Sequence, residues 1–466
     1  MTGPNRVVVV GAGAAGVAAA LSAARRGAQV TLVESQGFVG GNSAVLPWLG
    51  FHSREYQRVV GGLALELADA LRAAGAGSED VLDPVCGSAF SLNGHVFKAL
   101  AIQRLTEAGV RVDLHGQVVE VGLVGDRLKS VVVQHHSGRT RLGADVFIDA
   151  SGDGELSALA GATWEKGGGD GLVQAPSLVF RVSGIDRARF VAYLQDPESR
   201  FRDLLEGSPD AYAKLIARLP EQEVVILGGL AGVLSRAREA GRIDVPATRV
   251  VGVKTHVRDE FVAVTTKIAR FDPLDAASLS DAYAVGYGQV CQLMEAFRAG
   301  IPGFEQGRLA EIAPMLGVRE SRRIMADYVL TGDDVVEGRT FEDGVGMGAY
   351  HIDIHRPDGT WVDSHGVRPY DLPARALRVS GLENLLVAGK CFSATHEAIA
   401  STRVIPVCMA QGEAAGAMAA MSPGGDVRAI HLPSLQASLM DAGAILRPRL
   451  APPDPAVMER VGVIGR

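Results

Sequence analysis

Two polar side chains near the C-terminus of this 466-residue chain are candidates for direct chemistry. His396 and Arg403 lie in one loop-like segment that precedes an apolar run containing small residues. A histidine can exchange protons near neutral pH, and an arginine can bind an anion. We therefore expect both side chains to face a substrate. A solvated or cofactor-orienting role for His396 is the alternative.

Alternating polar residues form a second candidate group. His351, Asp353 and His355 would share one side of a strand, because side chains alternate across a strand. That side could line an active site in which a histidine serves as general acid or base. The same residues could instead form the polar outer face of an edge strand. His-x-Asp-x-His is also a weak pattern for a metal site, and we predict no metal.

Three arginines form a third group. Arg319, Arg322 and Arg323 have the spacing of one helix face, where they could bind an anion or donate a proton. Ion pairing of at least two of them with Glu320, Asp333 or Asp334 is the alternative. We keep Arg319 as a candidate catalytic residue.

The elements that must position these groups begin with a glycine-rich turn at the N-terminus. Residues 7–10 are four valines, which is typical of a buried parallel strand. The motif G-x-G-x-x-G follows at Gly11, Gly13 and Gly16, and an alanine-rich segment predicts a helix over 14–25. A second strand over 29–34 ends at Glu34, which should accept hydrogen bonds from an adenosine ribose. This strand, turn, helix and acidic residue predict a dinucleotide-binding fold.

Segments after Glu34 resemble the FAD-binding flavoproteins of the glutathione-reductase-like superfamily. The first is a Gly-Gly-x-Ser turn at 40–43, which in that superfamily runs along the pyrophosphate. The second is an apolar strand over 144–149 followed by Ala150-Ser151-Gly152, where a plain strand–loop–helix junction capped by Asp153 is the alternative. The resemblance also implies that backbone near Val118 faces the adenine.

The whole chain resembles the FAD-dependent oxidoreductases related to the fumarate reductase and succinate dehydrogenase flavoproteins. The matching segments are 7–16, 147–162, 317–335, 350–355 and 384–420. The resemblance implies that a helix over 404–421, with Pro406 near its start, points its N-terminus at the flavin pyrimidine. It also implies that a cation near Arg403 binds a substrate carboxylate, although the spacing departs from the fumarate reductase pattern.

The predicted cofactor is FAD. The residues expected to contact it are Gly11, Gly13, Ala14, Ala15, Gly16, Glu34, Ser35, Gly40, Gly41, Asn42, Ser43, Val118, Ala150, Ser151, Gly152, Gly389, Lys390, Arg403 and Val404.

The predicted fold class is α/β. A Rossmann-like FAD-binding domain, with a parallel sheet, helices and a small antiparallel layer, would be built from residues 1–165 and 346–466. An α+β substrate or capping domain would be inserted at 166–345, after the Gly167-Gly168-Gly169 boundary. We expect strands over 177–183, 250–255 and 260–268 there, and a helix over 277–297.

Composition narrows the function further. The chain is 47% hydrophobic and 21% charged, with a net charge of −7 and no Lys/Arg-rich run, so we expect no nucleic-acid or membrane partner. Four cysteines without a C-x-x-C pair predict reduced, buried thiols in a cytoplasmic protein. The lack of a second G-x-G-x-x-G unit argues against a built-in NAD(P)H domain.

The predicted function is hydride transfer between a small organic substrate and flavin N5, as dehydrogenation or reduction. Alternatives are a flavin-dependent oxidase using O2, a tRNA-modifying flavoprotein and a non-catalytic flavin carrier. A separate electron donor or acceptor, or a homo-oligomer, is compatible with the sequence. The flavin could be held with or without a covalent bond.

Overall fold

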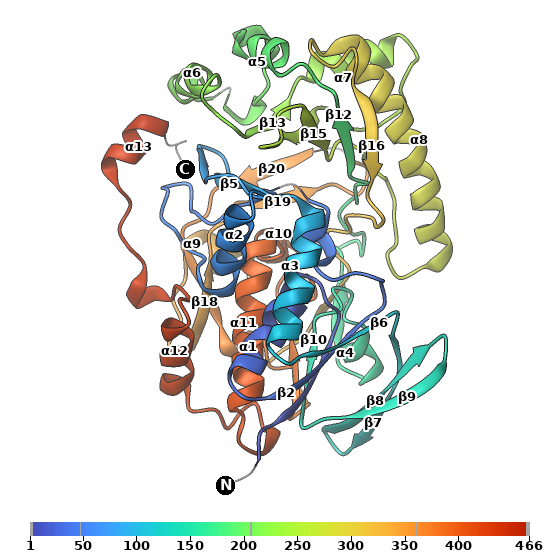
Figure 1. Ribbon diagram of the computed structural model, residues 1–466, viewed down its shortest axis with the longest axis vertical. Helices are drawn as coiled ribbons and strands as arrows, with labels where there is room; N and C mark the ends of the chain where they lie inside the picture. The colour runs from blue at the N-terminus through green and yellow to red at the C-terminus, as the bar shows by residue number, and fades with distance from the viewer. Residues whose placement is uncertain (1–2, 47, 206, 360, 463–466) are drawn as a thin grey trace.

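A parallel sheet forms the centre of the computed structural model, which describes residues 3–46, 48–205, 207–359 and 361–462. The sheet has five strands, in the order β22 (Leu385–Val387), β10 (Val146–Asp149), β1 (Arg6–Val10), β2 (Gln29–Glu34) and β6 (Arg111–Leu114) (Figure 1). All four residues of β10 and all four valines of β1 are buried, as expected for central parallel strands. Both ends of the chain therefore build one sheet.

Close helix packing also joins the two ends of the chain. The helices around this sheet are α1 (Ala14–Arg25), α2 (Gly62–Ala73), α3 (Gly94–Glu107) and α11 (Ile405–Met421). Figure 1 shows α1 and α11 side by side, and a methyl group on Gly412 would lie only 2.0 Å from the Ala15 carbonyl oxygen. One on Gly416 would lie 2.2 Å from the Ala19 carbonyl oxygen. These glycines therefore allow α11 to approach α1 to a distance that a larger residue would prevent.

A small antiparallel layer extends from this domain, as predicted. Its strands are β7 (Gln117–Val124), β8 (Arg127–His135) and β9 (Gly138–Gly143). The short helix α4 (Glu155–Leu159) follows β10. Asp153 does not cap that helix, because Gly154 occupies the N-cap position and Asp153 pairs with Lys390.

A second, antiparallel sheet forms the upper part of Figure 1. Its order is β13 (Val225–Gly229), β14 (Val250–Lys254), β15 (Glu260–Ala263), β12 (Phe180–Ser183) and β16 (Arg308–Ile312). Helices of this region are α5 (Arg187–Gln195), α6 (Pro209–Arg218), α7 (Ala231–Glu239) and α8 (Ala276–Gly300). Its core contains a cluster of aromatic rings: Phe180, Phe190, Phe261, Phe297 and Phe304.

The strands β12 and β15 are shorter than the predicted strands over 177–183 and 260–268. The hydroxyl of Thr266 accepts from the Leu178 amide at 2.7 Å and donates to the Leu178 carbonyl at 2.9 Å. Side-chain bonds thus replace the backbone ladder beyond Ala263 and before Phe180.

Short elements complete the fold. The paired strands are β11 (Trp164–Lys166) with β17 (Arg322–Ile324), β18 (Gly344–Gly348) with β21 (Tyr370–Pro373), β19 (Ile352–His355) with β20 (Trp361–His365), and β5 (Gly87–Ser91) with β3 (Trp48–Leu49) and β4 (Val81–Asp83). The remaining α-helices of the described residues are α9 (Gly332–Glu337), α10 (His396–Thr402), α12 (Leu432–Asp441) and α13 (Pro455–Val461). The exact domain limits stay a prediction, although Leu330, Val335 and Val345 pack in the core of the first domain.

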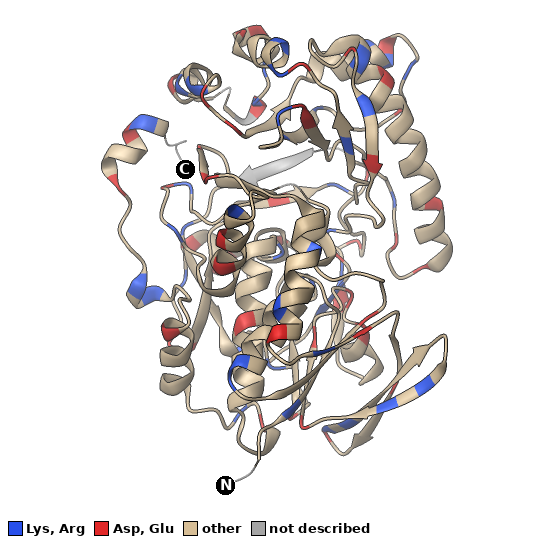
Figure 2. Ribbon diagram, in the orientation of Figure 1, with Lys and Arg blue, Asp and Glu red and all other residues tan. Residues whose placement is uncertain are grey.

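Charge, thiols and hydropathy add three observations. Figure 2 shows Lys and Arg interspersed with Asp and Glu through both sheet regions. All four cysteines are free, but Cys291 is exposed and Cys86 only partly buried, so the prediction of uniformly buried thiols was wrong for these two. No single helix of the described residues is long and apolar enough to span a membrane; α10 and α11 meet that criterion only as a pair bent by 92°.

Candidate cofactor and substrate site

A cavity of about 400 Å³ lies where the carboxyl ends of the parallel strands face the second sheet. Its lining includes the turn after β1, the end of β2, the turn after β10 and the start of α11. Residues of β13 and β14 line it from the other domain. Open α/β sheets bind their ligands at this edge.

The three glycines of the N-terminal motif have distinct structural roles. Gly11 has a φ of 93°, and a methyl group there would lie 2.4 Å from the Ala150 carbonyl oxygen. A methyl group on Gly16 would lie 1.8 Å from the Gly11 carbonyl oxygen, so Gly16 serves helix packing and does not line the cavity. Gly13 lines the cavity, and a methyl group there would meet no protein atom within 4 Å. The motif thus leaves open space at Gly13 alone.

Glu34 ends β2 at the cavity wall. Its Oε2 accepts from the Ala12 amide at 2.7 Å, and its Oε1 accepts from the Gln36 amide at 2.7 Å. Ser35 lines the cavity beside it and donates from Oγ to Glu34 Oε1 at 3.2 Å. These bonds hold the carboxylate at the place expected for a ribose contact.

Most of the other residues predicted to contact the cofactor do line the cavity. They are Ala14, Ala15, Gly41, Asn42, Val118, Ala150, Ser151, Gly152, Gly389, Lys390, Arg403 and Val404. Gly40 and Ser43 do not. Gly40, with a φ of 104°, turns the chain into the 3-10 helix at Gly41–Ala44 and packs near Phe97, while Ser43 is fully buried.

The helices α1 and α11 both point an uncapped N-terminus at this cavity. No side chain caps α1 at Gly13 or α11 at Val404, and Pro406 lies in the first turn of α11 as predicted. The first amide groups of a helix have no partner within the helix, and the helix dipole places partial positive charge there. The cavity therefore offers two sites for negative charge, one on each helix.

Arg403, from the first candidate group, meets Asp353, from the His351–Asp353–His355 group, at the start of α11. Arg403 ends α10, and its Nη2 donates to the Asp353 carbonyl at 2.8 Å and lies 3.9 Å from Asp353 Oδ2. His355 Nε2 lies 3.0 Å from the same Oδ2. Burial alone would raise the pKa of Asp353, but the neighbouring His355, His351 and Arg403 side chains hold that pKa well below its usual range.

His351 and His355 line the cavity from the strand β19 and the residue before it. Both are at least 95% buried within the protein, with 3% and 4% exposure, so the edge-strand interpretation was wrong. Burial lowers the pKa of His351 to about 4, and burial followed by the nearby Arg319 lowers the pKa of His355 well below its usual value. The two imidazoles are therefore neutral at pH 7. Among the described residues, no group of three or more potential ligands has the arrangement of a metal site.

Arg319 reaches the cavity from a segment without regular secondary structure, so the predicted helix over the three arginines was wrong. Arg322 and Arg323 belong to β17, which pairs with β11 and therefore turns neighbouring side chains to opposite faces. Arg323 forms the expected ion pair with Glu320. Arg322 instead donates to the Asp153 carbonyl at 3.0 Å, so the alternative in which at least two of the arginines pair with Glu320, Asp333 or Asp334 was wrong. Arg319 alone of the three lines the cavity.

His396 lies outside the cavity lining. It is the first residue of α10, and its Nδ1 lies 2.9 Å from Glu320 Oε2. Its contact with the buried Glu320–Arg323 pair indicates a structural role, and the side chain does not face the cavity in which a substrate would bind.

A family model described as FAD dependent oxidoreductase matches residues 6–439. The chain belongs to this family. This FAD-dependent oxidoreductase is therefore an enzyme with an FAD cofactor, whereas the finer relation to fumarate reductase remains a prediction. A comparison with curated proteins found no match.

Solved structures with a similar fold include several flavoenzymes. A triple mutant of the flavin-dependent brominase Bmp2 is 14% identical, with a TM-score of 0.47 over 94% of this chain and 84% of that one. A geranylgeranyl bacteriochlorophyll reductase-like protein from Thermoplasma acidophilum is 12% identical, with a TM-score of 0.45 over 94% and 82%. p-Nitrophenol 4-monooxygenase PnpA from Pseudomonas putida DLL-E4 is 14% identical, with a TM-score of 0.42 over 99% and 92%.

The residues of this FAD-dependent oxidoreductase fit its cofactor. The open space at Gly13 and the uncapped start of α1 suit a pyrophosphate, and Glu34 suits a ribose. The uncapped start of α11 suits the electron-rich end of a flavin.

Three groups at the site were missed by the sequence analysis. Arg202 of the second domain lines the cavity and pairs with buried Asp83 at 2.5 Å. Lys267 is buried and contacts His355 Nδ1, and Cys86 lines the cavity near Arg202. A lysine inside the apolar run 260–268 was the one available signal; Arg202 and Cys86 belong to no motif.

Proposed function

We propose that this enzyme transfers a hydride between a small organic substrate and flavin N5, as a dehydrogenase or reductase. The observation that carries the proposal is the meeting of Arg403, Asp353 and His351 with the dinucleotide loops in one cavity. FAD bound there would supply the hydride acceptor or donor. The polar side chains would bind the substrate and handle its proton.

Arg403 is the proposed substrate-orienting residue. Its guanidinium bonds to the Asp353 carbonyl and, at 3.3 Å, to Gln174 Oε1, and it is held directly before the start of α11. Its Nε has no partner among the described residues. That nitrogen is a remaining donor for a substrate oxygen.

His351 is the proposed proton-exchanging residue. Its ring stacks on Tyr350 at a centroid distance of 4.1 Å, and its Nδ1 is buried without a partner among the described residues. His355 is less suited, because its two ring nitrogens contact Lys267 and Asp353. A neutral imidazole at His351 can accept a proton as the substrate is oxidised, or return one during reduction.

Anaerobic reduction of the holoenzyme tests this proposal. Panels of alcohols, amines and saturated acids are mixed with oxidised enzyme, and activated alkenes with reduced enzyme, while flavin absorbance near ~450 nm is followed. We expect one panel to bleach or restore the flavin, and His351→Asn to slow that step while FAD content stays constant. His431→Gln, at an exposed position bonded to Ser434, is the control.

Three outcomes would separate the alternatives. Peroxide released with rapid reoxidation in air would favour the oxidase. A salt-sensitive complex with tRNA would favour the RNA-modifying alternative. A flavin that exchanges electrons with no panel member in either direction would contradict the proposal.

A further inference from the structure

Arg319 is a buried cation whose hydrogen-bond partners among the described residues are all neutral. Its Nη1 donates to the Ala175 carbonyl at 2.5 Å and its Nη2 to Ser177 Oγ at 3.1 Å. The residue is 9% exposed and lines the cavity. Burial, followed by the nearby Arg403, lowers its pKa to about 9, although Asp353 acts in the opposite direction. An arginine with this pKa is still charged at pH 7.

The charges at this end of the cavity do not balance. The charged side chains in the described lining there are Arg202, Arg319, Arg403 and Asp353. Asp83 compensates Arg202, and Asp353 lies 3.9 Å from Arg403 and also interacts electrostatically with Arg319. The two histidines are neutral, and burial lowers the pKa of Lys267 well below its usual value. Arg319 and Arg403 therefore share one carboxylate, Asp353, which leaves one positive charge uncompensated.

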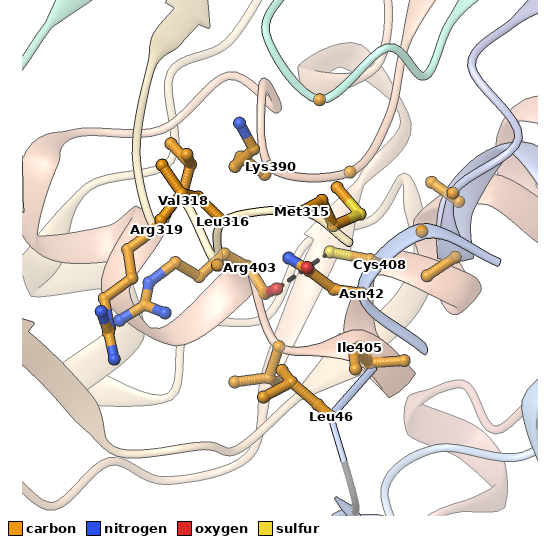
Figure 3. Close-up of a pocket in the computed structure, with 18 of the residues that line it drawn as sticks. Asn42, Leu46, Met315, Leu316, Val318, Arg319, Lys390, Arg403, Ile405 and Cys408 are labelled. Carbon is orange, nitrogen blue, oxygen red and sulfur yellow. Dashed lines mark hydrogen bonds between the residues drawn. The ribbon is translucent and has the colours of Figure 1, made fainter. Parts of the chain in front are cut away.

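An apolar wall lines the same cavity. Its side chains come from the second sheet and the segments beside it: Val179, Ile226, Leu227, Val251, Val264 and Leu316. Figure 3 shows Leu316 and Val318 next to Arg319, whose guanidinium lies beside that of Arg403. A ligand held at the two guanidinium groups would therefore lie next to Leu316, and its body could extend along the other wall residues of the cavity.

We propose that the substrate is a monoanionic organic acid with an apolar body, its carboxylate bound by Arg319 and its body against the apolar wall. This inference rests on the proposed function, because it names the substrate class for the same cavity. A guanidinium donates paired N–H groups that match a carboxylate, and buried apolar area adds affinity along the body. A short dianion would leave one negative charge uncompensated and the wall uncovered.

Binding of octanoate to the oxidised holoenzyme tests the proposal without any turnover. Isothermal titration and the change in flavin absorbance are followed for octanoate, octanol, acetate and succinate. We expect octanoate to bind at least about tenfold more tightly than the other three compounds. Octanol lacks the negative charge, acetate lacks the apolar body, and succinate carries two negative charges. Equal or tighter binding of octanol or succinate would overturn the proposal.

Two variants assign the interaction to its residues. Arg319→Gln should weaken octanoate about tenfold or more and leave octanol unchanged, while Arg319→Lys should restore part of the affinity. Val251→Thr, similar in shape but polar, should weaken octanoate severalfold and leave acetate unchanged, and it keeps the test valid if the Arg319 variants lose FAD. Arg308→Gln, on the exposed part of β16, is the control.

The outcomes separate this inference from the proposed function. Octanoate binding that depends on Arg319 supports the substrate class even if no panel compound reduces the flavin. Flavin reduction by a neutral compound, with octanoate affinity unchanged in Arg319→Gln and Val251→Thr, would overturn the substrate class and leave hydride transfer intact.

Discussion

The Gly389 amide donates a hydrogen bond to Gln411 Oε1 over 2.8 Å, and Gln411 Nε2 donates to the Thr402 carbonyl over 3.1 Å. One buried side chain of α11 thus connects the turn after β22 to the end of α10. Gly389, with a φ of 94°, lines the cavity, and the start of α11 follows Thr402 closely. The amide of Gln411 therefore sets the distance between two segments expected to contact FAD.

Removing this link should weaken cofactor binding. Gln411→Ala leaves the Gly389 amide and the Thr402 carbonyl without their partner, at a cost of about 1–3 kcal/mol each if no water replaces it. We expect FAD affinity to fall about tenfold or more, measured by titrating apoenzyme with FAD. Gln103→Ala, at an exposed position of α3, should bind FAD as wild type does, and unchanged affinity in Gln411→Ala would contradict the account.

The glycines of the first turn should separate folding from binding. Gly13→Ala adds a methyl group that meets no protein atom, so the free energy of unfolding of the apoenzyme should change by less than about 1 kcal/mol. FAD affinity should fall at least about tenfold, because the methyl group enters the cavity. Gly16→Ala should instead destabilise the apoenzyme by at least about 2 kcal/mol, because its methyl group meets a carbonyl oxygen. Denaturant unfolding of both apoenzymes measures these changes. Equal effects of the two substitutions on the free energy of unfolding would contradict the prediction.

Substitution of Arg403 should affect the substrate more than the flavin. Arg403→Gln should lower kcat/KM about tenfold to a hundredfold, the range for loss of a hydrogen bond to a charged group. FAD content should be retained, since the amides at the start of α11 remain. Steady-state kinetics with the substrate found anaerobically gives the measurement. An unchanged kcat/KM in Arg403→Gln would show that Arg403 does not bind the substrate.

The pH dependence of flavin reduction should lack an ordinary histidine limb. Burial lowers the pKa of His351 to about 4, so its imidazole stays neutral down to about pH 5. The rate of flavin reduction in the free enzyme should therefore not fall between pH 7.5 and 5.5 through protonation of His351. A loss of rate centred near pH 6.5 that disappears in His351→Asn would show that this histidine titrates normally.

Glu413 should make the protein less stable as pH rises. It is 3% exposed in α11, its Oε2 accepts from the Leu63 amide at 3.0 Å, and burial raises its pKa to about 7. A carboxyl with a raised folded-state pKa binds more protons in the folded state, so stability falls between about pH 4.5 and 7 and is then level. Glu413→Gln should reduce that fall by about 1–3 kcal/mol in unfolding measured at pH 5 and 8. Glu239→Gln, at an exposed position of α7, should leave this fall in stability unchanged. If Glu413→Gln also leaves it unchanged, titration of the buried Glu413 is not its cause.

The local parts of the cofactor site could be predicted from the sequence. The valine strand, Gly11 to Gly16 and Glu34 are adjacent in the chain, and their geometry follows from backbone sterics and periodicity. The sequence also predicted α11 and the contribution of Gly389 and Arg403 from the far end. Ser43 was misassigned, because a Gly-Gly-x-Ser pattern does not say which way each side chain turns.

The substrate end was less predictable, because long-range pairing decides it. Arg319 to Arg323 has helical spacing, but pairing of β17 with β11 overrides that local pattern. His396 contacts Glu320, which is far from it in the sequence, so local patterns could not predict this contact. Arg202 and Lys267 reach the site only because the second domain folds over the first.

The most direct test of the account is the absorbance spectrum of the purified protein, repeated on the supernatant after acid denaturation. We predict flavin bands near ~375 and ~450 nm that pass into the supernatant, as one FAD held in the cavity built from both ends of the chain. Flavin retained in the precipitate would instead indicate a covalent bond to the protein. A colourless protein that takes up no added FAD would contradict the central claim.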